Sequence, residues 1–237
     1  MRGEKTIAGA GDQEERWWYR VGGLSALLLG LAYVLIVALY VSAGAPPRGG
    51  EAWLTYAAGK TAAWWAIVGL SVLTDVLFVP VAVALYVALR RVDRTLLPLG
   101  TACVGLFVVL DLAVTWPNIA ALVALSGSYA AATTDAERAA SVAAATYASA
   151  VLTSTLVGVY SIADLSVGIL LIGLVMLRSP FGKATAYLGV ATGILGIVSV
   201  AGPLLVSALG PLIILTSVLT TVWVLLVGYR LYRLGQP

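Results

Sequence analysis

The chain has 237 residues, of which 61% are hydrophobic and only 11% are charged, and its formal net charge is +3. A soluble globular domain has roughly 45–50% apolar and about 25% charged residues. Charged residues are therefore too few to coat a water-facing surface, which excludes a soluble domain, a disordered chain and a nucleic-acid-binding protein. The composition predicts an all-α, polytopic integral membrane protein.

Six segments are long and apolar enough to cross a bilayer, for which about 20 mostly apolar residues suffice. They are residues 22–43, 62–89, 96–126, 148–177, 184–208 and 211–229. We expect a cytoplasmic N-terminal segment over 1–21, one six-helix transmembrane domain over 22–233, and a cytoplasmic tail over 234–237.

Basic residues are distributed unevenly between the two sides of these spans. Eleven of the 14 Lys and Arg residues lie on the side that holds both termini, and the other three are Arg48, Lys60 and Arg138. Cytoplasmic loops carry an excess of Lys and Arg, so both termini are expected in the cytoplasm. The corresponding location is a bacterial inner membrane, with the lipid bilayer as the surrounding partner.

The two longer connections lie on the outer side. Residues 44–61 hold a short stretch with Trp53, which we expect on the membrane surface, with Trp53, Trp64 and Trp65 as interfacial anchors. Residues 127–147 contain Thr134 followed three positions later by Glu137, a capping-box pattern. The fourth membrane helix is therefore expected to begin outside the membrane.

Missing residue types restrict the chemistry. The chain has no histidine, and its one cysteine, Cys103, lies in an apolar run. No intrachain disulfide and no cysteine-cluster metal site can form, and no P-loop or dinucleotide fingerprint is present. We expect no cofactor and no catalytic residues.

The most informative residues are Asp75, Asp111 and Asp164, one in each of the second, third and fourth spans. A charged residue at the centre of a membrane helix costs roughly 2.5–3.5 kcal/mol on insertion scales, so it needs partners and usually has a function. The three lie 14–17 residues from the nearest inner arginine along their helices. Because this spacing is similar, the three carboxyls are expected to share one layer of the bundle.

Polar residues continue outward from each aspartate at helical spacing. They are Ser71 from Asp75, Thr115 and Asn118 from Asp111, and Tyr160 and Ser161 from Asp164. Inward, the same faces are apolar. This pattern predicts an outward-open polar pocket, with Trp116 and Pro117 at its rim and Pro117 bending the third helix.

Three functions are compatible with this pocket. The leading hypothesis is a non-enzymatic sensor or small transporter that binds a cation, protons or a small ligand at the aspartates. The second is a structural subunit that binds a membrane protein partner or a second copy of itself, in which neutral aspartates hydrogen-bond between helices. The third is an intramembrane hydrolase, although the sequence around Asp164 lacks the glycine-rich motif of the aspartyl group.

A further pattern concerns packing in the fifth span. Gly189, Gly193 and Gly196 fall on one helix face, and Gly189 and Gly193 form a GxxxG motif that permits close helix approach. We expect packing within the bundle ahead of a specific dimer contact.

The chain resembles a family of small six-span bacterial membrane proteins catalogued as a domain of unknown function. The resemblance lies in the basic end of the second span, residues 85–91, and in the short turn over residues 177–183 before a glycine-rich span. It implies the six-span plan and no particular activity.

Overall fold

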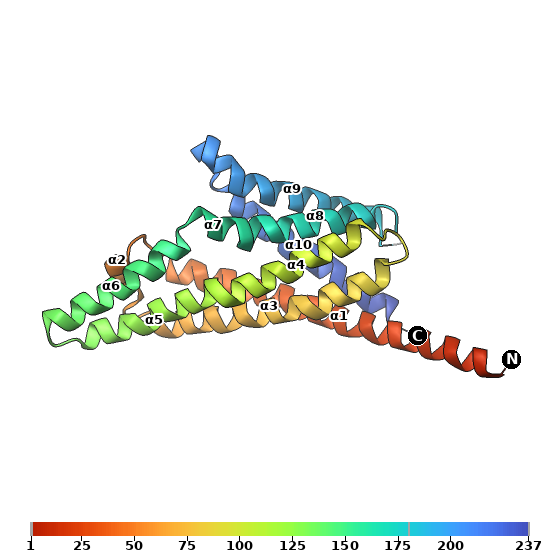
Figure 1. Ribbon diagram of the computed structural model, residues 1–237, viewed down its shortest axis with the longest axis horizontal. Helices are drawn as coiled ribbons and strands as arrows, with labels where there is room; N and C mark the ends of the chain where they lie inside the picture. The colour runs from red at the N-terminus through yellow and green to blue at the C-terminus, as the bar shows by residue number, and fades with distance from the viewer. Residues whose placement is uncertain (1, 180, 237) are drawn as a thin grey trace. The chain divides into compact units, whose positions relative to one another are not determined.

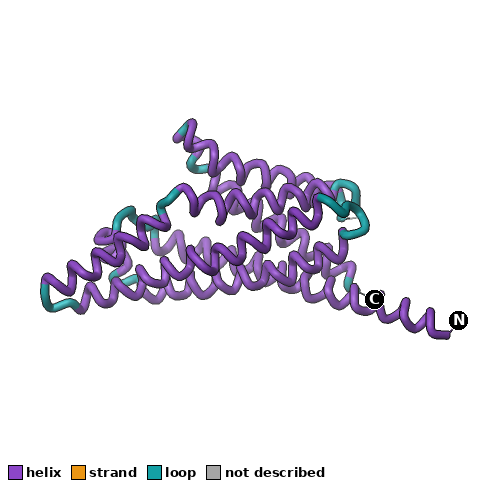
Figure 2. The backbone as a smooth tube through the Cα atoms, viewed as in Figure 1, coloured by secondary structure: helices purple, strands orange, loops and turns teal. Residues whose placement is uncertain are grey.

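The computed structural model describes residues 2–179 and 181–236, with side chains for 13–179, 181–206 and 208–236. This part of the chain is helical and contains no strand (Figure 2). Its elements, shown in Figure 1, are α1 (Arg2–Ala43), α2 (Gly50–Ala57), α3 (Thr61–Leu89), α4 (Leu96–Leu110), η1 (Asp111–Thr115), α5 (Trp116–Ala131), α6 (Asp135–Leu152), α7 (Thr155–Gly158), η2 (Val159–Ala163), α8 (Asp164–Met176), α9 (Lys183–Leu205), η3 (Ser207–Leu209) and α10 (Leu212–Leu234). Of the short elements, η1 and η2 are π-helical and η3 is a 3-10 turn.

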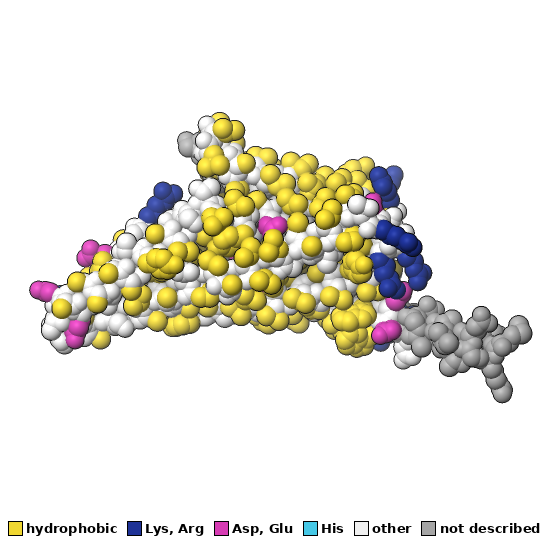
Figure 3. All heavy atoms as spheres, in the orientation of Figure 1, with side chains coloured by type: hydrophobic (Ala, Val, Ile, Leu, Met, Phe, Trp, Pro, Cys, Tyr) yellow, Lys and Arg dark blue, Asp and Glu magenta, His cyan; other side chains and the backbone are white. Residues whose placement is uncertain are grey.

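Six helical segments of the described chain are long and apolar enough to cross a membrane, as predicted. They are Gln13–Ala43, Thr61–Leu89, Leu96–Ala131, Thr155–Met176, Lys183–Leu205 and Leu212–Leu234. Apolar side chains cover much of the face seen in Figure 3, as expected of helices that contact lipid. The protein is therefore an all-α, multi-pass membrane protein.

The chain forms two compact units, each assembled from segments that are distant in sequence. The first unit comprises Met1–Leu31, Val76–Val108 and Ile162–Pro237. The second comprises Ala32–Asp75 and Val109–Ser161. The boundaries between the units fall within three helices, so α1, α3 and α4 each contribute residues to both units.

Small residues bring α8, α9 and α10 together in the first unit. Gly189 of α9 lies against Gly173 of α8 and against the indole of Trp223 on α10. One turn further along α9, Gly193 lies against the backbone carbonyl of Ser166. Gly196, the third glycine on this face, also packs on Ser166. The helix face predicted from the glycine spacing thus contacts neighbouring helices of the same chain.

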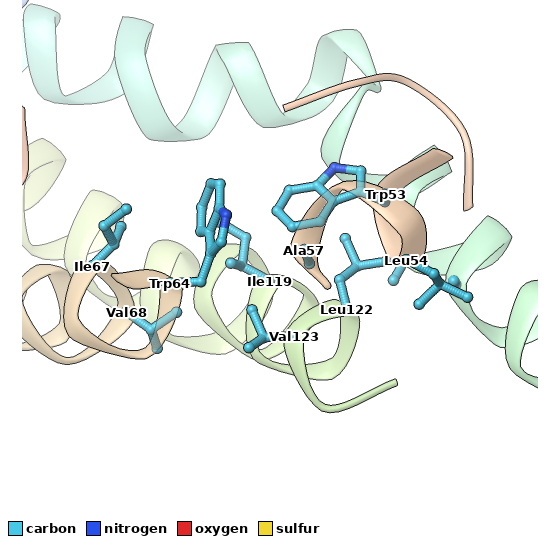
Figure 4. Packing of buried hydrophobic residues seen from close by; sticks show 11 residues of the cluster. Trp53, Leu54, Ala57, Trp64, Ile67, Val68, Ile119, Leu122 and Val123 are labelled. Atoms are coloured by element: carbon cyan, nitrogen blue, oxygen red, sulfur yellow. The ribbon is translucent and has the colours of Figure 1, made fainter. Parts of the chain in front are cut away.

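An aromatic cluster forms the core of the second unit and changes the expected role of two tryptophans. Trp53 and Trp64 are 5% and 1% exposed, and their rings lie 4.8 Å apart (Figure 4). The short helix α2, which carries Trp53, packs on α5 and α6. The prediction that these two indoles anchor at the membrane interface is therefore wrong. Burial against other apolar side chains removes more indole surface from water than a membrane surface does.

Hydrogen bonds fix the path of the chain into α2 and α3. The hydroxyl of Tyr56 donates to the carbonyl of Gly44 at 2.5 Å, and the Lys60 ammonium donates to the carbonyl of Ala43 at 2.7 Å. Burial raises the pKa of Tyr56 above its ordinary value, so the phenol stays a donor. These bonds satisfy carbonyls at the end of α1 that have no partner within the helix.

The helix α6 begins as predicted and ends earlier than predicted. Thr134 accepts a hydrogen bond from the amide of Glu137, whose carboxylate accepts from the amide of Thr134, which completes the capping box. The helix ends at Leu152, and α7 begins at Thr155. The Thr153 hydroxyl bonds to the carbonyl of Ser149 at 2.8 Å. Hydroxyl side chains that compete for backbone groups favour such breaks.

Candidate functional site

Two of the three intramembrane aspartates lie together in the second unit. Asp75 and Asp111 are 2% and 5% exposed, and each carboxyl lies within electrostatic reach of the other. These two carboxyls are therefore not exposed to solvent in this structure. Burying a carboxyl in an apolar span is costly unless hydrogen bonds or a counter-charge compensate it.

Asp75 is held by an indole from a different helix. Near the middle of α3, its Oδ2 accepts a hydrogen bond of 2.7 Å from Nε1 of Trp116, the first residue of α5. An indole N–H is a donor only, so the bond has one direction. Trp116 was expected at the rim of the pocket, and it is instead the direct partner of a carboxyl.

Asp111 is held by a hydroxyl network. The Ser161 hydroxyl donates to Oδ1 of Asp111 at 2.7 Å. The Thr115 hydroxyl lies 3.2 Å from the same Ser161 oxygen. Asp111 and Thr115 are the first and last residues of η1, and Ser161 lies in η2. Ser161 was grouped with Asp164 in the sequence, and its hydroxyl serves Asp111.

Two π-helical segments, η1 and η2, supply the side chains of the hydroxyl network around Asp111. In η1 the amide of Trp116 bonds to the carbonyl of Asp111, five residues earlier, which is the π-helical pattern. Pro117 follows directly, and it lacks an N–H and clashes with the carbonyl four residues before it. Widening the helix by one residue relieves this clash. It also turns Asp111 and Thr115 onto the side that faces Ser161. Single π turns in α-helices are frequent at functional sites.

A third hydroxyl, that of Tyr160, lies beside this network. Tyr160, adjacent to Ser161 in η2, is 8% exposed, and its hydroxyl lies near the Thr115 side chain without a hydrogen bond of good geometry. The same ring lies within electrostatic reach of Asp111. The phenol is thus a third polar group beside the Asp111 carboxyl.

No sequence pattern indicated that a second tyrosine, Tyr33, lies near the two carboxyls. Tyr33 on α1 lies within electrostatic reach of both Asp75 and Asp111. It occupies an apolar stretch of the first span that contains no acidic residue. Nothing in the spacing of that stretch links it to the other spans, so only the folded chain reveals the proximity.

The remaining predicted residues divide between the two units. Ser71 is buried one turn from Asp75 on α3. The Asn118 amide donates to the carbonyl of Val114 at 2.8 Å, so it is engaged by its own helix. Asp164, in contrast, belongs to the first unit, where Cys103 is its neighbour and its Oδ2 is buried without a described partner. Within one unit the structure therefore shows Asp75 and Asp111 together, and it assigns Asp164 to the other unit.

No basic side chain among the described residues neutralises the pair. The ion pairs among the described residues join Arg90 and Arg91 to Glu15, and Arg178 to Asp93. All of these lie in the first unit. In the same part of the chain, no group of three or more His, Cys, Asp or Glu residues is placed to hold a metal ion. The second unit thus contains two buried carboxyls held only by neutral donors.

Comparisons of the chain with models of protein families, with curated proteins and with solved structures find no match. The function must therefore be inferred from the chemistry of the site, because a helical membrane fold by itself is compatible with many activities.

Proposed function

We propose that this protein is a non-enzymatic membrane transporter or sensor that takes up a proton at the Asp75–Asp111 pair. The observation that carries the proposal is the pairing of two buried carboxyls with neutral donors and with no basic residue as a counter-ion. The coarser conclusion, a multi-pass membrane protein, does not depend on this step.

The charge balance of the site favours a bound positive species. Two ionised carboxylates that share a medium of low dielectric constant repel each other strongly. Trp116 and Ser161 each contribute a dipole but no charge. A proton shared within the pair removes the repulsion, and its loss restores it, so proton occupancy changes the interaction between the helices that carry the two residues.

A proton fits the donor set better than a metal cation does. Hard cations such as Ca²⁺ require six to eight oxygen ligands. Here one oxygen of each carboxyl already accepts a hydrogen bond. The Tyr160 hydroxyl, which lies beside Thr115 and within electrostatic reach of Asp111, is able to donate to or accept from a group that titrates beside it. Proton relays in membrane proteins are commonly built from carboxyls with such neighbours.

A structural role is the second candidate, and one observation favours it. The bond between Trp116 and Asp75 joins α3 to α5, and the bond between Ser161 and Asp111 joins η2 to η1. Hydrogen bonds between membrane helices contribute about 0.6 kcal/mol on average. Permanently protonated aspartates that only link helices would need no exchange of protons.

Infrared difference spectroscopy distinguishes the two candidates. The protein, labelled with ¹³C-aspartate and reconstituted in lipid, is titrated from about pH 5 to about pH 9. We expect a protonated carboxyl band that disappears reversibly within this range while the helical amide bands stay constant. The variants Asp75→Asn and Asp111→Asn should each remove or shift the band, and Asp135→Asn, at the exposed start of α6, is the matched control.

The outcomes are distinct. A carboxyl band that persists unchanged across the whole range supports the structural role and overturns the proposal. Carboxylates that stay ionised at every pH would also overturn it, and a response of their bands to added sodium or calcium would then assign the site to a cation.

We further propose that both termini face the cytoplasm of a bacterial cell and that the chain belongs to the six-span family it resembles. The excess of basic residues on the terminal side supports the orientation. Reporter domains that are active on only one side of the membrane, fused after residue 236 and inserted within the connection 132–134, test it directly.

A further inference from the structure

A basic cavity lies in the first unit where α3 ends and α4 begins. It has a volume of about 410 Å³ and is lined by Tyr86, Arg90, Arg91, Asp93, Arg94 and Pro98. Cavities that bind small ligands have volumes of roughly 300–1,000 Å³. Figure 3 shows dark blue side chains gathered in the region of the α3–α4 and α8–α9 connections.

The positive charge of this cavity exceeds what the neighbouring acids neutralise. Glu15 is shared by Arg90 at 2.8 Å and Arg91 at 3.4 Å. Arg91 nevertheless remains 82% exposed, which leaves most of its guanidinium free. Among the described side chains Arg94 forms no ion pair, and it is exposed. An arginine fork is suited to bidentate contacts with phosphate oxygens.

The acid within the cavity is committed to other partners. Oδ1 of Asp93 accepts from the amides of Thr95 and Leu96, both at 2.9 Å, and so caps the start of α4. These two amides lower the pKa of Asp93 below its ordinary value. Its other oxygen lies 3.7 Å from Arg178. Asp93 thus shapes the cavity and stabilises the turn, and it leaves Arg91 and Arg94 available to a bound anion.

Apolar helix faces continue from the cavity into the spans. Tyr86 and Val79, seven residues apart on α3, are 39% and 50% exposed. Leu99 and Leu106, seven residues apart on α4, are 55% and 52% exposed. Residues seven apart lie on one side of a helix, so each span presents an apolar strip that leads away from the arginines. A phosphate group alone would make no contact with such strips, whereas the acyl chains of a lipid would lie along them.

We propose that this cavity binds the phosphate headgroup of an anionic phospholipid, with Arg91 and Arg94 as the principal donors and the exposed strips of α3 and α4 in contact with its acyl chains. Both spans end at this cavity, so it lies at the level of the bilayer where lipid phosphates are found. Basic pockets between membrane helices are suited to such headgroups. The inference does not depend on the proton site of the second unit.

Native mass spectrometry of the full-length protein tests the proposal, with phosphatidylglycerol and phosphatidylcholine as the lipid probes. We expect phosphatidylglycerol to remain bound preferentially and to raise the melting temperature. The double variant R91Q/R94Q should bind it roughly 30-fold more weakly, since each arginine near an anionic lipid contributes about a five-fold factor. The matched control is R48Q/R138Q, which removes two arginines on the opposite side of the spans.

Each outcome supports or overturns the proposal. Equal binding by R91Q/R94Q and the wild type would overturn it, as would equal losses in the two double variants. Inorganic phosphate or glycerol phosphate, added in detergent, should not reproduce the stabilisation. If either does so fully, the cavity binds a soluble phosphate and the assignment to a lipid is wrong. A circular-dichroism spectrum like that of the wild type shows that R91Q/R94Q is folded.

Discussion

The hydrogen bond between Trp116 and Asp75 permits a quantitative test of the site. We consider the single variants Trp116→Phe and Asp75→Leu and the corresponding double variant. Trp116→Phe removes the donor 2.7 Å from Oδ2 of Asp75 and also some ring volume. Asp75→Leu removes the acceptor at similar size. In a double-mutant cycle the costs that belong to one side chain alone cancel, which leaves the coupling between the two.

The size of the coupling depends on the charge of Asp75. A hydrogen bond to a charged group contributes about 1.5–3 kcal/mol to stability. A bond between neutral groups in a membrane protein contributes about 0.6 kcal/mol on average. If Asp75 carries the proton at low pH and releases it at high pH, the coupling should rise from the smaller toward the larger value as the pH increases.

Reversible unfolding in mixed micelles gives the four free energies of unfolding at each pH. It is followed by the circular-dichroism signal of the helices, because this signal does not rely on the tryptophan that one variant removes. A coupling within about 0.3 kcal/mol of zero at every pH would refute the assignment of Trp116 as the partner of Asp75. A constant coupling of about 0.6 kcal/mol would keep the bond and contradict a change of charge.

Two further predictions concern packing and pH. Gly189→Ala would place its Cβ 2.6 Å from Nε1 of Trp223, which is only 2% exposed, so we expect a loss of about 1–3 kcal/mol from overpacking, read as a lower melting temperature. Gly105→Ala, with nothing within 4 Å of its Cβ, is the control, and equal losses would contradict the contact. The amides of Thr133 and Thr134 lower the pKa of Glu137 below its ordinary 4.5, so its contribution to stability is present above that value and is lost as the pH falls through the folded value. Amide protection at the start of α6 should therefore fall in acid for the wild type but show no such step in Glu137→Gln, and identical pH profiles would show that the carboxylate does not cap the helix.

The site shows where inference from the sequence stops. The cost of burying an aspartate made Asp75 and Asp111 recognisable as special, because an apolar span offers no water to solvate a charge. Trp116 was expected only at the rim of the pocket, because the sequence does not show which group its indole N–H meets. Its role depends on the π turn of η1, which is a property of the folded helix next to Pro117.

The predicted interfacial role of Trp53 and Trp64 in the second unit was wrong for a related reason. Trp53 and Trp64 lie near the ends of predicted spans, where interfacial anchoring is the common role of tryptophan. Their burial depends on α2 packing on α5 and α6, which lie more than 50 residues further along the chain. No local pattern encodes such a contact.

The number of the spans, the capping box at Thr134 and the exceptional standing of the aspartates were determined by the sequence alone. Each follows from a local requirement: the thickness of the bilayer, the unpaired amides of a helix start and the cost of a buried charge. The division of the carboxyls was decided only by the tertiary structure, which pairs Asp75 with Asp111 and places Asp164 in another unit. Depth along a span can be counted from its ends, but the direction in which a side chain points depends on the rotation of each helix against its neighbours, and packing sets that rotation.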